Sequence, residues 1–245
     1  MLLLLPAVFA AEPLAAEPLA DTVRAFALPE PDLADLPALD IWSTQYCVHE
    51  ATEIADGVVV RGPDEAPFPA ESPIHLSQRD FCYAALEGSA WVRRLDGSRV
   101  TINYAGVGEL SVDCGPVLGN SRWRTQGTVR FGLARGPYGD GAGGYILVPY
   151  RTLAVDPGVI PHGTVVYIPQ ARGVVFELNG ETFTHDGYFF AADVGGAIRD
   201  HHIDTFTADR CEGPLPHVTN IPAQTAPAIL LPAGAITETL EALHR

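Results

Sequence analysis

Residues 191–206 read AADVGGAIRDHHIDTF, a stretch that sets Asp193 and Asp204 on either side of Gly195 and Gly196. The glycines permit a turn, so two adjacent strands could present both carboxyl groups to one cleft. A third aspartate, Asp156, lies in the earlier stretch YRTLAVDPGVIPHGTVVYIP at 150–169. Carboxyl groups can protonate a glycosidic oxygen, and like charges held close raise the pKa of one of them. Aspartates beside glycine turns also often bond their own backbone.

The residues around this stretch predict a β-rich fold. The chain contains 24 glycines and 21 prolines, spread over its whole length, between short segments rich in Val, Ile, Thr, Tyr and Phe. Closely spaced strand signals predict a small closed barrel, which has no exposed sheet edge. These signals are YILVPY at 145–150, VVYIP at 165–169, GVVFEL at 173–178 and GYFFAAD at 187–193.

The first half of the chain carries weaker signals for local structure. Ser77 and Asp80 predict the start of a central helix, and Gly88 predicts its end. We read 105–143 as loop, because it is glycine-rich and has no clear period. Further predictions are a first strand at Trp42–Val48, a hairpin turn at Asp56–Gly57, a second hairpin joining Trp91–Leu95 to Val100–Tyr104, and a helix within Ala233–Arg245.

The N-terminus predicts export. Residues 1–10, MLLLLPAVFA, read as a signal peptide and are too short to span a membrane. Residues 11–40, with the repeat AEPLA, read as a flexible leader, and 41–245 as a single β-barrel domain. The four cysteines, an even number, predict two disulfides in a secreted or periplasmic protein, without selecting a connectivity.

Charge and motif spacing reduce the classes of partner and of site that we expect. A net charge of −15 argues against nucleic acid. His201 and His202 suggest a metal site, but neighbouring strand residues point to opposite faces, so we expect no metal and no cofactor. The single DVGG run lacks the second motif of an aspartic protease, and GDGAGG at 139–144 lacks the lysine of a phosphate-binding loop. We expect a monomer.

The segments VPYRTLAVDPGVIPHGTVVYIP and FFAADVGGAIRDHHIDTFTAD resemble the 3D domain, a family named for three aspartates. The region of resemblance is about 145–210. The family is similar to the C-terminal part of membrane-bound lytic transglycosylase A. The resemblance implies a double-psi β-barrel, related to expansins and to small endoglucanases with a His-Phe-Asp strand. It also implies lytic cleavage of peptidoglycan to 1,6-anhydro-muramic products.

The resemblance places the three aspartates at Asp156, Asp193 and Asp204. His202, Ile203 and Asp204 follow the His-Phe-Asp pattern, which implies that Asp204 is the acid and base, with Asp193 as its partner and Asp156 as support. Val194, Arg199 and the Asp200-His201-His202 run depart from the family pattern.

The remaining candidates are residues that could contact the glycan. We expect Trp123 to stack on a sugar ring, and the other substrate-binding candidates are Arg199, His202, Gly195, Gly196 and Tyr46. Two other functions remain open: a non-catalytic cell-wall glycan-binding barrel, as in expansins, and a polysaccharide hydrolase. The sequence does not decide whether 41–140 completes the barrel or forms a separate lobe.

Overall fold

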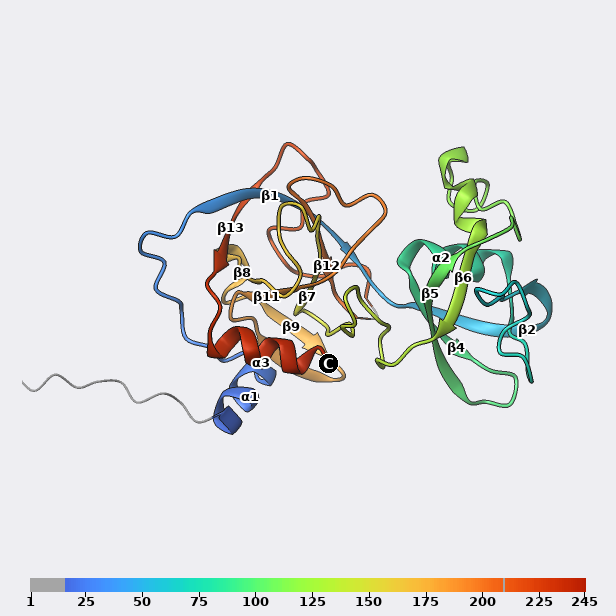
Figure 1. Ribbon diagram of the computed structural model, residues 1–245, viewed down its shortest axis with the longest axis horizontal. Coiled ribbons are helices and arrows are strands. Elements are labelled where there is room, and N and C mark those ends of the chain that lie inside the picture. Colours follow the sequence, from blue (N-terminus) through green and yellow to red (C-terminus); the bar gives the residue numbers. More distant parts are fainter. Residues whose placement is uncertain (1–15, 209) are drawn as a thin grey trace, which may run out of the picture.

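The computed structural model describes residues 16–208 and 210–245, which form two lobes (Figure 1). The larger lobe is a closed barrel of six strands in the order β1-β12-β7-β11-β8-β13. The closed barrel and the β-rich fold expected from the sequence are thereby confirmed. The barrel strands are β1 (Ala38–Tyr46), β7 (Thr152–Ala154), β8 (Val165–Tyr167), β11 (Tyr188–Asp193), β12 (His202–Phe206) and β13 (Ala226–Leu231).

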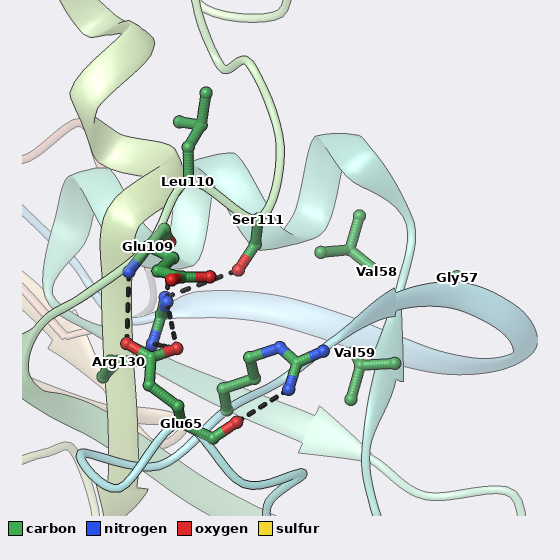
Figure 2. A pocket seen from close by; sticks show the side chains of 9 residues that line it. Gly57, Val58, Val59, Glu65, Glu109, Leu110, Ser111 and Arg130 are labelled. Atoms are coloured by element: carbon green, nitrogen blue, oxygen red, sulfur yellow. Dashed lines mark hydrogen bonds and ion pairs between the residues drawn. The ribbon is translucent and has the colours of Figure 1, made fainter.

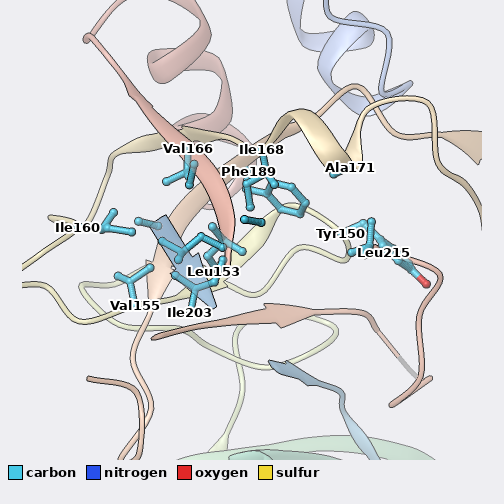
Figure 3. Close-up of a cluster of buried hydrophobic side chains, with 14 of the residues drawn as sticks. Tyr150, Leu153, Val155, Ile160, Val166, Ile168, Ala171, Phe189, Ile203 and Leu215 are labelled. Carbon is cyan, nitrogen blue, oxygen red and sulfur yellow. The ribbon is translucent and has the colours of Figure 1, made fainter. Parts of the chain in front are cut away.

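Branched aliphatic and aromatic side chains fill the barrel (Figure 3). Leu153, Val166, Phe189 and Ile203 come from four different strands, and each is fully buried. Side chains alternate between the two faces of a strand, so the residues next to these point outward. On β1 and β12 this alternation turns Thr44 and Asp204 outward, whereas on β11 a register shift between Ala191 and Asp193 interrupts the alternation and places Asp193 opposite Ala154.

The smaller lobe is a five-stranded sheet, in the order β3-β2-β4-β5-β6, with its own buried core. Residues 49–133 therefore lie outside the barrel, and the single barrel domain expected for 41–245 does not describe them. Phe81 packs edge-on against Phe131 in this core. The elements are β2 (His49–Val59), β3 (His75–Leu76), α2 (Gln78–Glu87), β4 (Ser89–Arg93), β5 (Arg99–Val107), η1 (Ser121–Thr128) and β6 (Val129–Leu133).

Residues 16–40 were expected to be a flexible leader, but they pack on the barrel. They include helix α1 (Ala16–Arg24), which lies against the C-terminal helix α3 (Ala235–Leu243). Arg151, fully buried, donates to the Val23 carbonyl oxygen at 2.6 Å and to both oxygens of Asp186. Asp186 also accepts from the Leu28 N–H at 3.1 Å. The predicted signal peptide, 1–10, and residues 11–15 lie outside the described residues.

The two disulfides expected from the even cysteine count are present among the described residues. Cys82–Cys114 lies within the smaller lobe. Cys47–Cys211 joins the segment after β1 to the segment after β12. Within the described ranges, no helix is long and apolar enough to cross a membrane.

Several local predictions are confirmed. Ser77 caps α2 by accepting from the Asp80 N–H, and Gly88 ends the helix with φ 80°. Strands β4 and β5 form the predicted hairpin, with Arg93 opposite Arg99. The C-terminal helix forms as α3.

Other local predictions are wrong. Asp56 and Gly57 make no turn: they lie within β2, where a Cβ on Gly57 would approach the Leu76 carbonyl oxygen to 2.3 Å. The supposed loop 105–143 contains the end of β5, η1 and β6. The run 145–150 forms none of the strands, although Tyr145 and Tyr150 are buried and Ile146 makes an isolated bridge with Asp140. Part of 173–178 forms β9 (Val175–Leu178), which pairs with β10 (Glu181–Thr184) outside the barrel, next to η2 (Pro169–Ala171).

Candidate functional site

Two neighbouring parallel strands of the barrel place polar side chains side by side on their outward face. Trp42 on β1 is in register with His202 on β12, and Thr44 is in register with Asp204. Residues two apart on a strand share a face, so these four side chains form two adjacent rows. The Thr44 hydroxyl donates to Asp204 Oδ1 at 2.8 Å.

Asp193 reaches the same face from β11. Asp193 and Asp204 are both in register with Ala154 of β7, the strand between them. Two strand spacings put their Cα atoms about 10 Å apart. The Tyr46 hydroxyl donates to Asp193 Oδ2 at 2.7 Å, and the Val194 N–H donates to Oδ1 at 2.8 Å. The structure therefore brings together two of the three aspartates, but β11 and β12 are not adjacent strands as the sequence suggested, because β7 lies between them.

Both carboxyl groups hold their protons more tightly than exposed aspartates. Removal from water raises the pKa of Asp204 to about 7, against the donated bond from Thr44, which lowers it, and the negative charges of Glu87 and Asp193 raise it further. Removal from water also raises the pKa of Asp193 to about 6, against the bonds from Tyr46 and Val194. Carboxyl groups in this range can donate and accept protons near neutral pH.

A third carboxyl group, Glu87, comes from the smaller lobe, and sequence reasoning missed it. Glu87 is the last residue of α2, and its Oε2 accepts from the Cys47 N–H at 3.1 Å, one residue after Tyr46. Removal from water raises the pKa of Glu87. The helix-ending glycine beside it could be read from the sequence, but the packing of α2 against the end of β1 could not.

His202 and Trp42 support Asp204 on the barrel face. Their rings stack with centroids 3.5 Å apart and an interplanar angle of 7°. His202 Nε2 lies 2.9 Å from the Thr44 hydroxyl, and Nδ1 lies 3.4 Å from the Ala197 carbonyl oxygen. Burial lowers the pKa of His202, so the ring is neutral at physiological pH. His202 is thus brought to the site, where it contacts Thr44 and Trp42.

Asp156, the third aspartate, binds backbone groups. Its Oδ1 accepts from the Gly158 N–H and its Oδ2 from the Asp200 N–H, each at 2.9 Å. The Asp200 and Gly158 amides lower the pKa of Asp156, so this group is a carboxylate at neutral pH. Asp200 has φ 56°, in the left-handed region. Asp156 therefore ties the turn after β7 to the turn before β12.

The other predicted contact residues have separate positions. Tyr46 is 8% exposed and bonded to Asp193, whereas Arg199 is exposed and donates to the carbonyl oxygens of Gly195 and Ile198. A Cβ on Gly195 would lie 2.5 Å from Ile198, whereas Gly196 faces open space. Gly195, Gly196 and Arg199 belong to the turn between Asp193 and Asp204, whereas Tyr46 lies on β1.

The loop 139–144 borders the site. The Ala142 N–H donates to the Ala192 carbonyl oxygen, and a Cβ on Gly141 would approach that oxygen to 2.3 Å. Trp123 lies elsewhere: it belongs to η1 of the smaller lobe, where Arg122 stacks on its ring at 4.5 Å. The structure does not group Trp123 with the carboxyl pair.

The two adjacent histidines make different contacts, but only His202 lies on a strand, because His201 belongs to the turn before β12. His201 Nδ1 lies 3.0 Å from the Asp40 carbonyl oxygen, while His202 contacts Thr44. Among the described residues, the Glu87 carboxylate lies within 4.8 Å of the sulfur atoms of Cys47 and Cys211, but those sulfurs are joined to each other. A disulfide offers no thiolate to a metal ion.

A pocket of about 570 Å³ lies on the smaller lobe, away from the carboxyl pair (Figure 2). Arg130 and Glu65, in its wall, are joined at 2.6 Å. Arg130 also donates to the Glu109 carbonyl oxygen and to the Ser111 hydroxyl. The Arg130 guanidinium is therefore already paired with groups of the smaller lobe, and we assign no ligand to this pocket.

One family model matches part of the chain. Residues 151–212 match the family model of the 3D domain, a segment that includes Asp156, Asp193 and Asp204. The chain matches no curated protein sequence.

Three solved structures are distantly similar. MltA of E. coli with bound chitohexaose is 18% identical, with 80% of this chain and 72% of that chain covered and a TM-score of 0.49. A membrane-bound lytic murein transglycosylase from Agrobacterium tumefaciens is 17% identical, with 78% and 74% covered and a TM-score of 0.49. The lytic transglycosylase LtgG of Burkholderia pseudomallei is 20% identical, with 80% and 73% covered and a TM-score of 0.41.

Proposed function

We propose that this chain, which carries a 3D domain at residues 151–212, cleaves peptidoglycan as a lytic transglycosylase. The observation that supports the proposal best is the pairing of Asp193 and Asp204 across β7, with the pKa of Asp204 raised to about 7. A carboxyl group that is half-protonated at neutral pH can serve as an acid and then as a base. The proposal extends to a double-psi arrangement of the six barrel strands.

Asp204 is the acid in this proposal. Its proton goes to the oxygen that leaves the anomeric carbon of N-acetylmuramic acid, and the bond between that carbon and oxygen breaks. The 6-hydroxyl of the same sugar attacks the anomeric carbon and gives its proton to the Asp204 carboxylate. A 1,6-anhydro ring forms, and Asp204 regains its proton. Because the nucleophile belongs to the substrate, one carboxyl group suffices.

Asp193, held by Tyr46, has a separate role. As its pKa is about 6, it is mostly ionised at pH 7, and its charge helps to keep Asp204 protonated. The Asp193 carboxylate can also stabilise the positive charge that develops at the anomeric carbon. Asp156 supports the site by fixing the Asp200 turn. The remaining candidates, Arg199, Gly195 and Gly196, form the turn that borders the glycan in this proposal.

The location follows from the proposed substrate. Peptidoglycan lies outside the cytoplasmic membrane, and disulfides such as Cys47–Cys211 and Cys82–Cys114 form in oxidising compartments. We therefore place the protein in the cell envelope or in the secreted fraction.

Digestion of purified peptidoglycan, followed by mass spectrometry of the products, tests this function. Anhydro-muropeptides from the wild-type protein, and a loss of about 10²-fold or more in Asp204→Asn, are the expected result. The rate should also fall as pH rises through about 7, because Asp204 loses the proton that it donates. Products with reducing ends, formed by addition of water, would identify a hydrolase. Binding of the glycan without any products would identify a glycan-binding barrel. Equal activity of Asp204→Asn and the wild type would rule out the site assignment.

A further inference from the structure

The Thr44 hydroxyl lies between an acid and an imidazole. Thr44 Oγ1 is 2.8 Å from Asp204 Oδ1 and 2.9 Å from His202 Nε2. A hydroxyl has one hydrogen, so it can donate to only one of these two atoms at a time. The other atom must then donate to the hydroxyl oxygen, or the contact is between two acceptors.

The two protonation states of Asp204 therefore require two different directions of the same hydrogen-bond chain. When Asp204 is protonated, its carboxyl O–H donates to Thr44, and Thr44 donates to a bare Nε2. The ring proton is then on Nδ1, where it donates to the Ala197 carbonyl oxygen at 3.4 Å. When Asp204 is ionised, Thr44 donates to the carboxylate, and Nε2 must carry the ring proton to donate to Thr44. The ionised chain holds one proton fewer.

We propose that the Thr44 hydroxyl couples the protonation state of Asp204 to the tautomer of His202. His202 is then a positioning residue: its ring does not touch the substrate but sets which way the Thr44 hydroxyl points. The Ala197 carbonyl oxygen favours the Nδ1–H tautomer and, through Thr44, the acid form of Asp204. The consequence for catalysis rests on the proposed role of Asp204 as the acid.

The surroundings of the ring suit a tautomer change more than a change of charge. His202 is only 7% exposed, and its stacking on Trp42 fixes the plane of the ring, so Nε2 stays beside Thr44 in either tautomer, while Nδ1 bonds the Ala197 carbonyl oxygen only when it carries the proton. Burial lowers the pKa of His202, which favours the neutral ring over the imidazolium form. The charged groups that act on Asp204 are Glu87 from α2 and Asp193 from β11, while β1 contributes the neutral groups of Thr44 and Tyr46.

Nuclear magnetic resonance of the full chain tests the coupling without any activity measurement. The ¹⁵N shifts of His202 report its tautomer, and the ¹³C shift of the Asp204 carboxyl reports its protonation. We expect the ring proton to move from Nδ1 to Nε2 as pH rises, with the same midpoint as the Asp204 titration. In Thr44→Val, which removes the hydroxyl, and in Asp204→Asn, the tautomer should no longer change with pH.

Thr44→Ser is the matched control, because it keeps a hydroxyl and should restore the pH-dependent tautomer. A wild-type tautomer that stays constant through the Asp204 titration, or one that still changes in Thr44→Val with retained fold, would overturn the coupling. If the coupling is present but peptidoglycan is not cleaved, the proposed function fails while this inference stands. The reverse pattern of results would reject this inference alone.

Discussion

Asp193 and Asp204 lie on opposite sides of a single residue, Ala154, with which both are in register. This relationship depends on β7, a strand of three residues placed between β11 and β12 in the barrel. It also sets the spacing of the two carboxyl groups, since each Cα is one strand spacing from Ala154.

The folding stability of the protein should carry a pH dependence that belongs to Asp204. The pKa of Asp204 is about 7 in the folded chain, against an ordinary value near 3.9, so the folded state binds the extra proton. The contribution of this proton to the free energy of unfolding is complete below about pH 4. It is lost as pH rises to about 7, with a slope of up to about 1.4 kcal/mol per pH unit. Denaturant unfolding of the wild type and Asp204→Asn at pH 4 to 8 measures the difference.

Subtracting the two profiles removes the titrating groups that are not coupled to Asp204, and leaves the contribution of Asp204 with its coupling to Asp193 and Glu87. Burial lowers the pKa values of His185, His217 and His244, which act in the opposite direction, but these residues are the same in both proteins. A wild-type stability that shows no loss relative to Asp204→Asn between pH 4 and pH 7 would contradict the raised pKa.

Tyr46→Phe should raise the pKa of Asp193 above about 6. The Tyr46 hydroxyl donates to Asp193 Oδ2 at 2.7 Å and lowers its pKa, and phenylalanine keeps the ring but not the donor. We expect a fall of roughly tenfold in peptidoglycan cleavage at pH 7, equivalent to about 1.4 kcal/mol, as Asp193 becomes neutral. Carboxyl ¹³C titration checks the pKa. Tyr104→Phe, at an exposed position of the smaller lobe, is the control. An unchanged Asp193 titration in Tyr46→Phe would contradict the prediction.

Glu87→Gln should lower the pKa of Asp204. Glu87 contributes a negative charge that raises this pKa, and glutamine keeps an oxygen to accept from the Cys47 N–H. We expect the midpoint of the Asp204 carboxyl titration to move below about 7. Glu50→Gln is the matched control, since Glu50 is exposed on β2 of the same lobe and its loss should leave the midpoint in place. If both variants shift the midpoint equally, the effect belongs to net charge.

Asp156→Ala should loosen the Asp200 turn without abolishing cleavage. It removes the acceptors of the Gly158 and Asp200 N–H groups. We expect faster hydrogen exchange at the Asp200 amide and a fall of roughly tenfold in cleavage rate, smaller than that of Asp204→Asn. Asp56→Ala, at an exposed aspartate on β2 outside the site, is the control. A loss of activity as large as that of Asp204→Asn, with native exchange at Asp200, would indicate a direct chemical role.

Arg151→Met should strongly destabilise the larger lobe. The side chains of Arg151 and Asp186 are 1% and 2% exposed, so removing one leaves a buried charge without its partner. The expected loss is about 3–5 kcal/mol, measured by denaturant unfolding. Arg124→Met removes an exposed ion pair with Asp113 and should cost less than about 1 kcal/mol. Equal losses in the two variants would show that the buried pair does not hold residues 16–40 on the barrel.

The sequence by itself determined much of the local structure and the identity of two site residues. Ser77 and Gly88 bound α2 because capping is a contact between near neighbours in the chain. Glycines between Asp193 and Asp204 marked a connection between strands, and the pattern of three aspartates matched the 3D domain. Local signals failed at Gly57, which permits a close approach by Leu76 from another strand.

Only the tertiary structure decided how these groups act on one another. The pairing of Asp193 with Tyr46 and of Asp204 with Thr44 depends on β1 lying beside β12, across more than 140 residues of chain. The approach of Glu87 depends on how the smaller lobe packs at the end of β1. Burial and through-space charge set the pKa values, and both depend on long-range neighbours that no local pattern specifies. The sequence therefore supplied the carboxyl groups of the site, whereas the fold set their proton affinities.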